Sequence, residues 1–154
     1  MRTLAARRQF LGAAAALCAT GVLAAPDADT TVQVWKDPNC GCCKDWIAHV
    51  ERQGFKVRVF DQGNTAARAR LGMPQKLGSC HTAVVQGYVI EGHVPAGDIQ
   101  RLLKERPNAL GLAVPGMPIG SPGMDAPAYG GRRDPYQVLL VQKDGTATVF
   151  SNHS

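Results

Sequence analysis

Residues 31–50 decide the fold, and they read TVQVWKDPNCGCCKDWIAHV. The first part, Thr31 to Trp35, alternates polar and apolar side chains, which predicts a β-strand with one buried face. After a short loop, apolar residues recur at the spacing of one helical face, at Cys43, Trp46, Ile47 and Val50. The stretch therefore predicts a strand, a loop that carries three cysteines, and a helix that follows this loop directly.

The next sixty residues extend this start into an α/β order. The patterns predict a strand over 55–60, a short helix over 65–71, a hairpin over 82–91 that turns at Gly87, and a helix between Pro95 and Pro107. The order β-α-β-α-β-β-α is that of a thioredoxin-like domain, so we expect a mixed sheet flanked by helices. Parallel strands joined by right-handed crossovers would place the cysteine loop at the carboxyl end of the first strand.

The C-terminal part has a different character. Residues 111–135 are rich in glycine, proline and methionine and show neither a helix nor a strand period, which predicts a long loop. Loops of this length are usually functional or disordered. Two final strands, 136–142 and 146–150, flank Asp144-Gly145, which is a strong hairpin signal.

The cysteine loop is the most informative chemical feature. Cys40, Cys42 and Cys43 lie within four residues, and soft thiolates that converge in one loop suit Cu(I), zinc or an iron–sulfur centre. Cys40 and Cys43 also have the C-x-x-C spacing of redox-active dithiols. Metal binding and electron transfer are both open on this evidence. Metal binding is favoured, because disulfide exchange needs two cysteines and this loop has three.

Cys80 is expected to complete the set. It lies just before the third strand, and in a thioredoxin-like layout this position faces the C-x-x-C loop across the end of the sheet. The alternative is an inert buried cysteine. The adjacent His81 is a candidate ligand or a hydrogen-bond donor to a ligand, with a structural histidine as the alternative. Met117 and Met124 carry thioethers, which suit Cu(I), although methionines in loops also pack against cores.

The N-terminus predicts export. Arg7-Arg8-Gln9-Phe10-Leu11 precedes an apolar stretch that ends at Ala24, too short for a membrane span and followed by small residues suited to cleavage. We interpret residues 1–25 as a signal peptide of the twin-arginine or the Sec type, residues 26–154 as one metal-binding domain, and the periplasm as its location.

Cleavage of this signal would change the composition. It removes Cys18 and three arginines but no acidic residue, so the formal net charge falls from +5 to +2. A nearly neutral domain gives no electrostatic case for nucleic acid, and we expect no membrane association after cleavage.

The remaining candidates have ordinary structural interpretations. We expect Met73 to pack in the core, His93 to orient the turn into the following helix, His49 to lie at the surface, His153 to lie at a frayed end, and Trp35 and Trp46 to be core aromatics. Ligation by His93 is the less favoured alternative.

Four runs resemble one protein family. They are Asp37-Pro38-Asn39-Cys40-Gly41-Cys42-Cys43, Ser79-Cys80-His81-Thr82, Gly92-His93-Val94-Pro95, and the run from Gly116 to Met124, which reads GMPIGSPGM. They are similar, in the same order, to motifs of the CopG-type family, small exported bacterial proteins associated with copper resistance. The resemblance covers roughly Thr31 to Ser151. It implies a thioredoxin-like fold that binds Cu(I), alone or as a multinuclear thiolate centre, through the four cysteines, with the methionine loop at Met117 and Met124.

Two functions remain open at this point. The first is a Cu(I)-binding protein that sequesters copper or hands it on, with copper-efflux or copper-carrier proteins as partners. The second is a thioredoxin-like oxidoreductase that exchanges disulfides or changes the oxidation state of copper. The proline expected before the third strand of a thioredoxin is replaced by Cys80-His81-Thr82, which counts against exchange with protein disulfides.

Overall fold

The structure is a computed structural model that describes residues 30–154. The interpretation of residues 1–25 as an export signal lies outside the described residues. Within the described part, no helix has the length and apolar character needed to cross a membrane.

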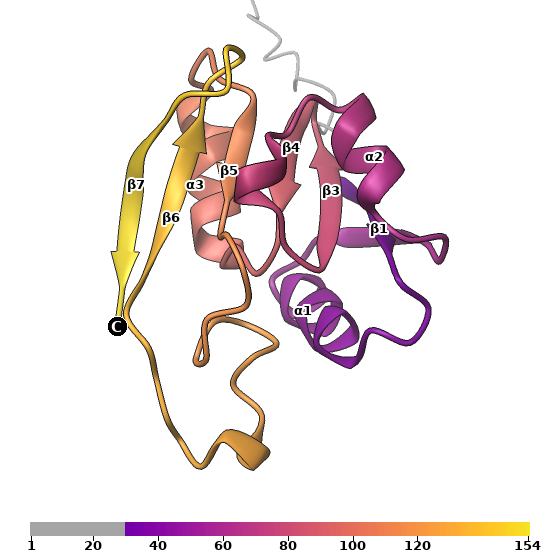
Figure 1. Ribbon diagram of the computed structural model, residues 1–154, viewed down its shortest axis with the longest axis vertical. Coiled ribbons are helices and arrows are strands. Elements are labelled where there is room, and N and C mark those ends of the chain that lie inside the picture. Colours follow the sequence, from indigo (N-terminus) through magenta and orange to yellow (C-terminus); the bar gives the residue numbers. More distant parts are fainter. Residues whose placement is uncertain (1–29) are drawn as a thin grey trace, which may run out of the picture.

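A single mixed sheet of seven strands organises the described chain (Figure 1), in the order β2-β1-β3-β4-β5-β6-β7. The elements are β1 (Thr31–Lys36), α1 (Gly41–Arg52), β2 (Lys56–Phe60), α2 (Thr65–Arg70), the 3-10 turn η1 (Gln75–Leu77), β3 (His81–Val85), β4 (Tyr88–Glu91), α3 (Ala96–Glu105), β5 (Gly111–Ala113), the 3-10 turn η2 (Pro127–Tyr129), β6 (Tyr136–Val141) and β7 (Ala147–His153).

The first half follows the predicted order from β1 to α3. Strands β1 and β2 are parallel and joined through α1, whereas β3 runs antiparallel to both β1 and β4. The β3–β4 hairpin turns at Gln86 and Gly87, both with positive φ, of 47° and 85°. This is the backbone geometry of a tight hairpin turn. The α/β prediction is confirmed, and the thioredoxin-like assignment remains an interpretation of this element order.

The second half contains a strand that the sequence pattern did not indicate. β5 pairs parallel with β4 and antiparallel with β6, so it joins the C-terminal hairpin to the rest of the sheet. The prediction of one continuous loop over residues 111–135 was therefore wrong at its start. Three buried residues are too few to show a period, and Gly111 gives no strand signal. A Cβ on Gly111 would lie 1.8 Å from the Val89 carbonyl oxygen, so the close pairing requires glycine.

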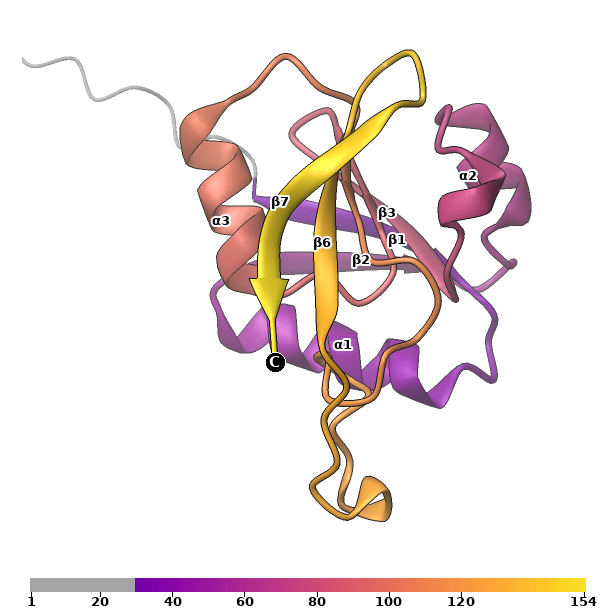
Figure 2. The same cartoon turned by 60° about the vertical axis from the view of Figure 1, so that its left-hand side comes forward.

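Two apolar clusters lie on opposite faces of the sheet. Successive strand residues point to opposite faces, and Val89 belongs to one cluster whereas Ile90 belongs to the other. The larger cluster packs α1, through Trp46 and Val50, and α3 against the sheet, and the smaller includes Met73. Figure 2 shows α2 and α3 on opposite sides of the strands.

The aromatic and methionine predictions can be compared directly with this core. Met73 is 3% exposed in the smaller cluster, so its predicted packing role is confirmed, and Trp46 is fully buried as expected. Trp35 is only partly buried and stacks on Phe60 with ring centroids 5.0 Å apart. It therefore lies at the margin of the core rather than inside it.

Candidate metal centre

The site is built where β1 ends and α1 begins. The Cys40 backbone N–H donates to the Asp37 carbonyl oxygen at 3.1 Å, and the Asn39 N–H donates to the Asp37 carboxylate at 2.8 Å. This tight turn puts Cys40 at the N-cap of α1, with Cys42 and Cys43 in its first turn. The three cysteines therefore lie at the end of α1 that carries the unpaired backbone N–H groups and the positive end of the helix dipole.

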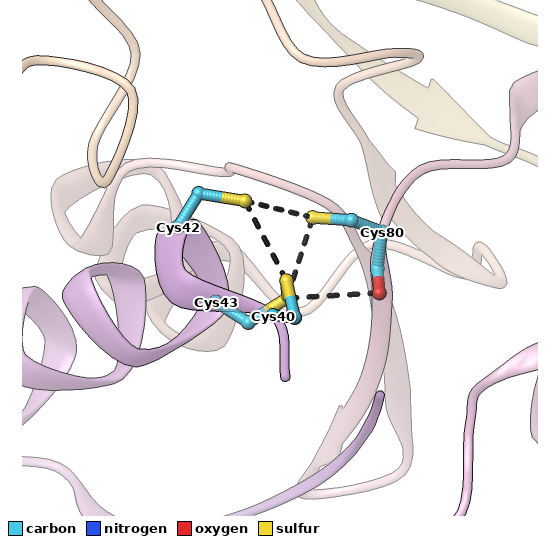
Figure 3. A group of neighbouring side chains, drawn as sticks. All are labelled: Cys40, Cys42, Cys43 and Cys80. Atoms are coloured by element: carbon cyan, nitrogen blue, oxygen red, sulfur yellow. Dashed lines mark hydrogen bonds between the residues drawn. A yellow bond between two sulfur atoms is a disulfide. The ribbon is translucent and has the colours of Figure 1, made fainter. Parts of the chain in front are cut away.

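The fourth cysteine arrives from the neighbouring strand. β3 begins at His81, and His81 pairs with Lys36 at the end of β1. Cys80, one residue earlier, therefore lies opposite the N-terminus of α1, and Figure 3 shows its side chain directed toward those of the α1 cysteines. We call Cys40, Cys42, Cys43 and Cys80 the cysteine cluster, and their sulfurs all lie within 4.8 Å of one another.

The distances within the cluster are short. The Cys42 sulfur lies 3.5 Å from that of Cys40 and 3.7 Å from that of Cys80, and the Cys43 sulfur lies 3.5 Å from that of Cys80. Cys40 and Cys43 form a disulfide, so Cys42 and Cys80 are the free thiols. The proximity expected from the sequence is present. The role of these residues as metal ligands remains a prediction.

A buried ion pair holds the loop that carries Cys80. The Glu91 carboxylate is fully buried and accepts hydrogen bonds from the Arg68 guanidinium (2.8 Å), the Ser79 backbone N–H (2.7 Å) and the Thr82 hydroxyl (2.6 Å). Arg68 also donates to the Ser79 carbonyl oxygen. Burial raises the pKa of Glu91, and the hydrogen bonds from Thr82, Ser79 and Arg68 oppose this effect. This network fixes the backbone immediately before Cys80.

Sequence reasoning missed this network. The only available signal was an acidic residue in the otherwise apolar run Tyr88-Val89-Ile90-Glu91. All four residues of β4 are buried, and a buried carboxylate requires a partner.

Burial changes the pKa of the Cys80 thiol. Loss of solvation raises its pKa to about 12, and the neighbouring Cys42 adds to the increase. Cys80 is therefore protonated near neutral pH when no metal is bound. A soft metal ion would have to displace this proton, so metal binding at Cys80 would release a proton and strengthen with rising pH.

Two histidines lie beside Cys80. His81 is fully buried, its ring centroid is 4.3 Å from that of Trp46, and its Nδ1 is 3.4 Å from the Cys80 sulfur. His93 is also buried, with Nε2 3.0 Å from the same sulfur and Nδ1 2.8 Å from the Pro122 carbonyl oxygen. His93 was expected mainly to orient a turn, and its contact with Cys80 was therefore underestimated. His93 lies just after β4, in the turn into α3, and the Pro122 carbonyl oxygen helps to orient its ring toward Cys80.

The methionine loop reaches the site through its backbone. A Cβ on Gly123 would lie 2.5 Å from the Cys42 carbonyl oxygen, so the loop passes directly against the first turn of α1. Met124 is 8% exposed, and its sulfur accepts a hydrogen bond from the Tyr129 hydroxyl at 3.7 Å. Met117 is 51% exposed, one residue after Gly116, whose carbonyl oxygen accepts a hydrogen bond from the Ser79 hydroxyl. The structure thus brings the loop to the site, and ligation by the two thioethers remains a prediction.

Two other histidines make contacts that the sequence did not indicate. His49, expected at the surface, is partly buried, and its Nε2 accepts a hydrogen bond from the Ala96 backbone N–H at 3.1 Å, at the start of α3. The prediction for His153 was wrong: it belongs to β7 rather than to a frayed end, and its Nε2 lies 2.7 Å from the Asp98 carboxylate. Both contacts join residues about fifty positions apart, which local patterns cannot reveal.

These observations define an α/β protein with a cluster of cysteines and histidines able to hold a soft metal ion. A family model described as protein of unknown function, DUF411, matches residues 77–124. No curated protein matches the chain.

Two solved structures resemble the described fold. They are "Copper resistance protein copG- Form 1" and "Form 2", each 49% identical to this chain over 80% of its length. The match covers 96% and 98% of those chains, with TM-scores of 0.73 and 0.74. The chain belongs to the CopG family of copper resistance proteins.

Proposed function

We propose that this protein is a periplasmic Cu(I)-binding protein that sequesters copper or passes it to copper-efflux or copper-carrier proteins. The observation that carries the proposal is the convergence of the cysteine cluster, with all four sulfurs within 4.8 Å of one another. The family supports a role related to copper, since the two similar structures are named copper resistance proteins. The periplasmic location rests on the export signal that the sequence predicts for residues 1–25.

The donor atoms favour Cu(I) over harder ions. The two potential metal-binding groups found among residues 30–154 consist of cysteines and histidines and include no carboxylate. Soft thiolates select Cu(I), zinc or iron–sulfur clusters, whereas carboxylates suit magnesium, calcium and manganese. Four sulfurs that all lie within 4.8 Å of one another, with three of the non-bonded pairs only 3.5 to 3.7 Å apart, could also bridge more than one Cu(I) ion.

A competition experiment tests this function. Residues 26–154, reduced and handled without oxygen, are titrated with Cu(I) against a chromophoric chelator and separately with Zn(II). We expect the protein to retain Cu(I) better than Zn(II), and Cys42→Ser or Cys80→Ser to lose most of this retention, because each removes an anionic ligand. Stoichiometric zinc without a preference for copper would refute the proposal.

The methionine loop supplies the second part of the proposal. We expect Met117 and Met124 to ligate or shield the bound Cu(I), since the loop lies against α1 at Gly123. Met117→Ala should weaken Cu(I) retention less than a cysteine substitution does, because a thioether is neutral. Val149→Ala is the matched control, since Val149 is 48% exposed and Met117 is 51% exposed. Equal retention in the methionine variant, the control and the unmodified protein would remove Met117 from the site.

One observation favours a second function, the oxidoreductase. The Cys40–Cys43 disulfide lies within 3.5 Å of the Cys80 sulfur, so the cluster can exist in an oxidised form. We propose that the oxidoreductase reaction is the oxidation of Cu(I) by the disulfide. The disulfide takes up two electrons and two protons to give two thiols, and two Cu(I) ions supply the electrons as they become Cu(II). Thiol titration after anaerobic addition of Cu(I) to the disulfide form tests it. An increase from two to four free thiols supports this function, and an unchanged count refutes it.

A further inference from the structure

Strand β2 forms one exposed edge of the sheet. It stands at the end of the strand order, so within residues 30–154 it pairs with β1 on one side and with no strand on the other. None of its five residues is buried, and Val59 is 39% exposed. An edge strand presents backbone N–H and C=O groups that can pair with another extended chain. β2 therefore offers a place where a partner can add a strand.

The other edge of the sheet, β7, is less suited to such pairing. Its register with β6 shifts between Val138 and Leu139, which is the mark of a β-bulge. Bulges twist an edge and protect it from further pairing. The register of β2 with β1, in contrast, is unbroken through all five residues of β2. Of the two edges, β2 is therefore the regular one.

A basic and aromatic surface covers one face of the β2 edge. Trp35 and Phe60, which are register partners in β1 and β2, stack with their ring centroids 5.0 Å apart. The guanidinium carbon of Arg58 lies 5.1 Å from the Phe60 centroid. Arg70, the last residue of α2, places its guanidinium carbon 5.3 Å from the Trp35 centroid. We call these four residues the arginine–aromatic ladder, and its ring contacts hold both charges in defined positions.

The two arginines of the arginine–aromatic ladder have no acidic partner in the described chain. Arg58 and Arg70 are exposed, and within residues 30–154 neither guanidinium forms a hydrogen bond or an ion pair. Arg68 and Arg101, by contrast, each pair with a glutamate. A guanidinium presents its donors in a planar fork that matches the two oxygens of a carboxylate. Both guanidiniums are therefore available to carboxylates of another molecule.

The alternation along β2 defines the sequence pattern that fits it. Successive residues of a strand point to opposite faces, so Lys56, Arg58 and Phe60 share one face of β2. Val57 and Val59 share the other face. In an added strand, acidic side chains on the first face would meet the basic residues, and apolar side chains on the second would meet the valines. The β2 strand of a second copy would instead bring like charges together, so an acidic partner is favoured.

We propose that β2 and the arginine–aromatic ladder bind an extended segment of a partner protein in which acidic and apolar residues alternate. β1 and β2 are parallel, so Phe60 lies at the end of the sheet where β1 leads into the cysteine loop. Lys36, the last residue of β1, and Asp61, directly after β2, form an ion pair of 2.6 Å at this end. A bound segment thus reaches the end of the sheet that carries the cysteine cluster. The identity of the partner as a copper carrier rests on the proposed function, whereas binding of the segment does not depend on copper.

Titration with a synthetic peptide tests the inference. The isotopically labelled, copper-free protein is titrated at low ionic strength with an end-blocked peptide that alternates glutamate and valine, and its backbone amide signals are followed by NMR. We expect saturable shifts and slower amide hydrogen exchange at residues 56–60, because the added strand covers this edge. Added salt should weaken the binding. A matched peptide with glutamine in place of glutamate should bind more weakly, since it offers no charge to the arginines.

Substitutions in the arginine–aromatic ladder locate the binding surface. Arg58→Gln and Arg70→Gln should each weaken binding of the glutamate peptide roughly two- to fivefold, the range expected for one exposed ion pair. Arg101→Gln is the matched control. Arg101 also lies over an aromatic ring, 4.1 Å from the Phe150 centroid, but it is already paired with Glu105. This variant should bind the peptide as the unmodified protein does.

Three outcomes would overturn the inference: no shifts or slowed exchange at residues 56–60, equal affinity for the glutamate and glutamine peptides, or unchanged affinity in Arg58→Gln and Arg70→Gln. The first two are measured on the unmodified protein, so they decide the question if a variant does not fold. Because copper is absent throughout, failure of the Cu(I) competition experiment would leave this result unaffected, and failure here would leave Cu(I) binding by the cysteine cluster unaffected.

Discussion

The buried pair of Arg68 and Glu91 offers the sharpest test of how this fold supports its site. Its side chains are 7% and 0% exposed, and a nitrogen–oxygen distance of 2.8 Å joins them. Glu91→Ala would leave the Arg68 charge buried without its partner and the Ser79 N–H without an acceptor. Removal of one member of a buried pair costs about 3 to 5 kcal/mol in unfolding free energy. For a domain of this size, we expect the melting temperature to fall by roughly 10 to 20 °C.

The chain provides a matched control at the same distance. Arg101 and Glu105 also lie 2.8 Å apart, but both side chains are 48% exposed. Glu105→Ala should therefore cost only about 0.3 to 0.5 kcal/mol, the usual value for an exposed helical pair. Both variants are compared with the unmodified protein by urea denaturation at pH 7, under reducing conditions and without metal. Equal small losses in the two variants would refute the argument that burial makes the Arg68–Glu91 pair structurally essential.

Three further predictions follow from hydrogen bonding, pKa and backbone geometry. His49→Ala should lower the free energy of unfolding by about 1 kcal/mol at pH 7, because it removes the imidazole nitrogen that accepts the Ala96 N–H at the start of α3. Burial lowers the pKa of His49, so the hydrogen bond is lost as pH falls and the imidazole is protonated. The difference in unfolding free energy between the variant and the unmodified protein should therefore shrink toward pH 5. Burial raises the pKa of Cys80 from 9.0 to about 12, so the stability that its protonated thiol contributes is fully present below pH 9 and is lost toward pH 12. The free energy of unfolding should therefore fall less between pH 8 and pH 11 in Cys80→Ser than in the unmodified protein, and an equal fall in both would contradict this. Gly123→Ala should lower the melting temperature more than Gly116→Ala does. Both glycines have positive φ, of 87° and 69°, but only a Cβ at position 123 would meet the Cys42 carbonyl oxygen. Equal decreases in melting temperature would exclude that contact.

Local patterns were sufficient to predict most of the fold. The alternation in 31–35 and the helical spacing from Cys43 to Val50 both arise from burial of one face, and the structure has β1 and α1 there. β5 escaped prediction because its three residues are all buried and therefore show no alternation. Its place in the sheet depends on pairing with β4 and β6, which the sequence of 111–113 does not encode locally.

The candidate site was predictable where topology alone determines proximity. Cys80 was expected beside the cysteine loop because the residue before β3 lies at the same end of the sheet as the end of β1, and the structure has this arrangement. The contact of His93 with Cys80 could not be predicted in the same way. It depends on the turn between β4 and α3 and on the Pro122 carbonyl oxygen, which belongs to a loop without a regular pattern.

The most direct test of the central claim is X-ray absorption at the copper edge of the reduced protein loaded with Cu(I) without oxygen. We expect a first coordination shell dominated by sulfur, because the cysteine cluster supplies four sulfurs within 4.8 Å of one another. The Cys42→Ser variant should lose sulfur scattering or copper content, since the Cys42 sulfur lies within 3.7 Å of those of Cys40 and Cys80. A shell of nitrogen or oxygen with little sulfur, unchanged in this variant, would contradict the proposal that the cysteine cluster binds Cu(I).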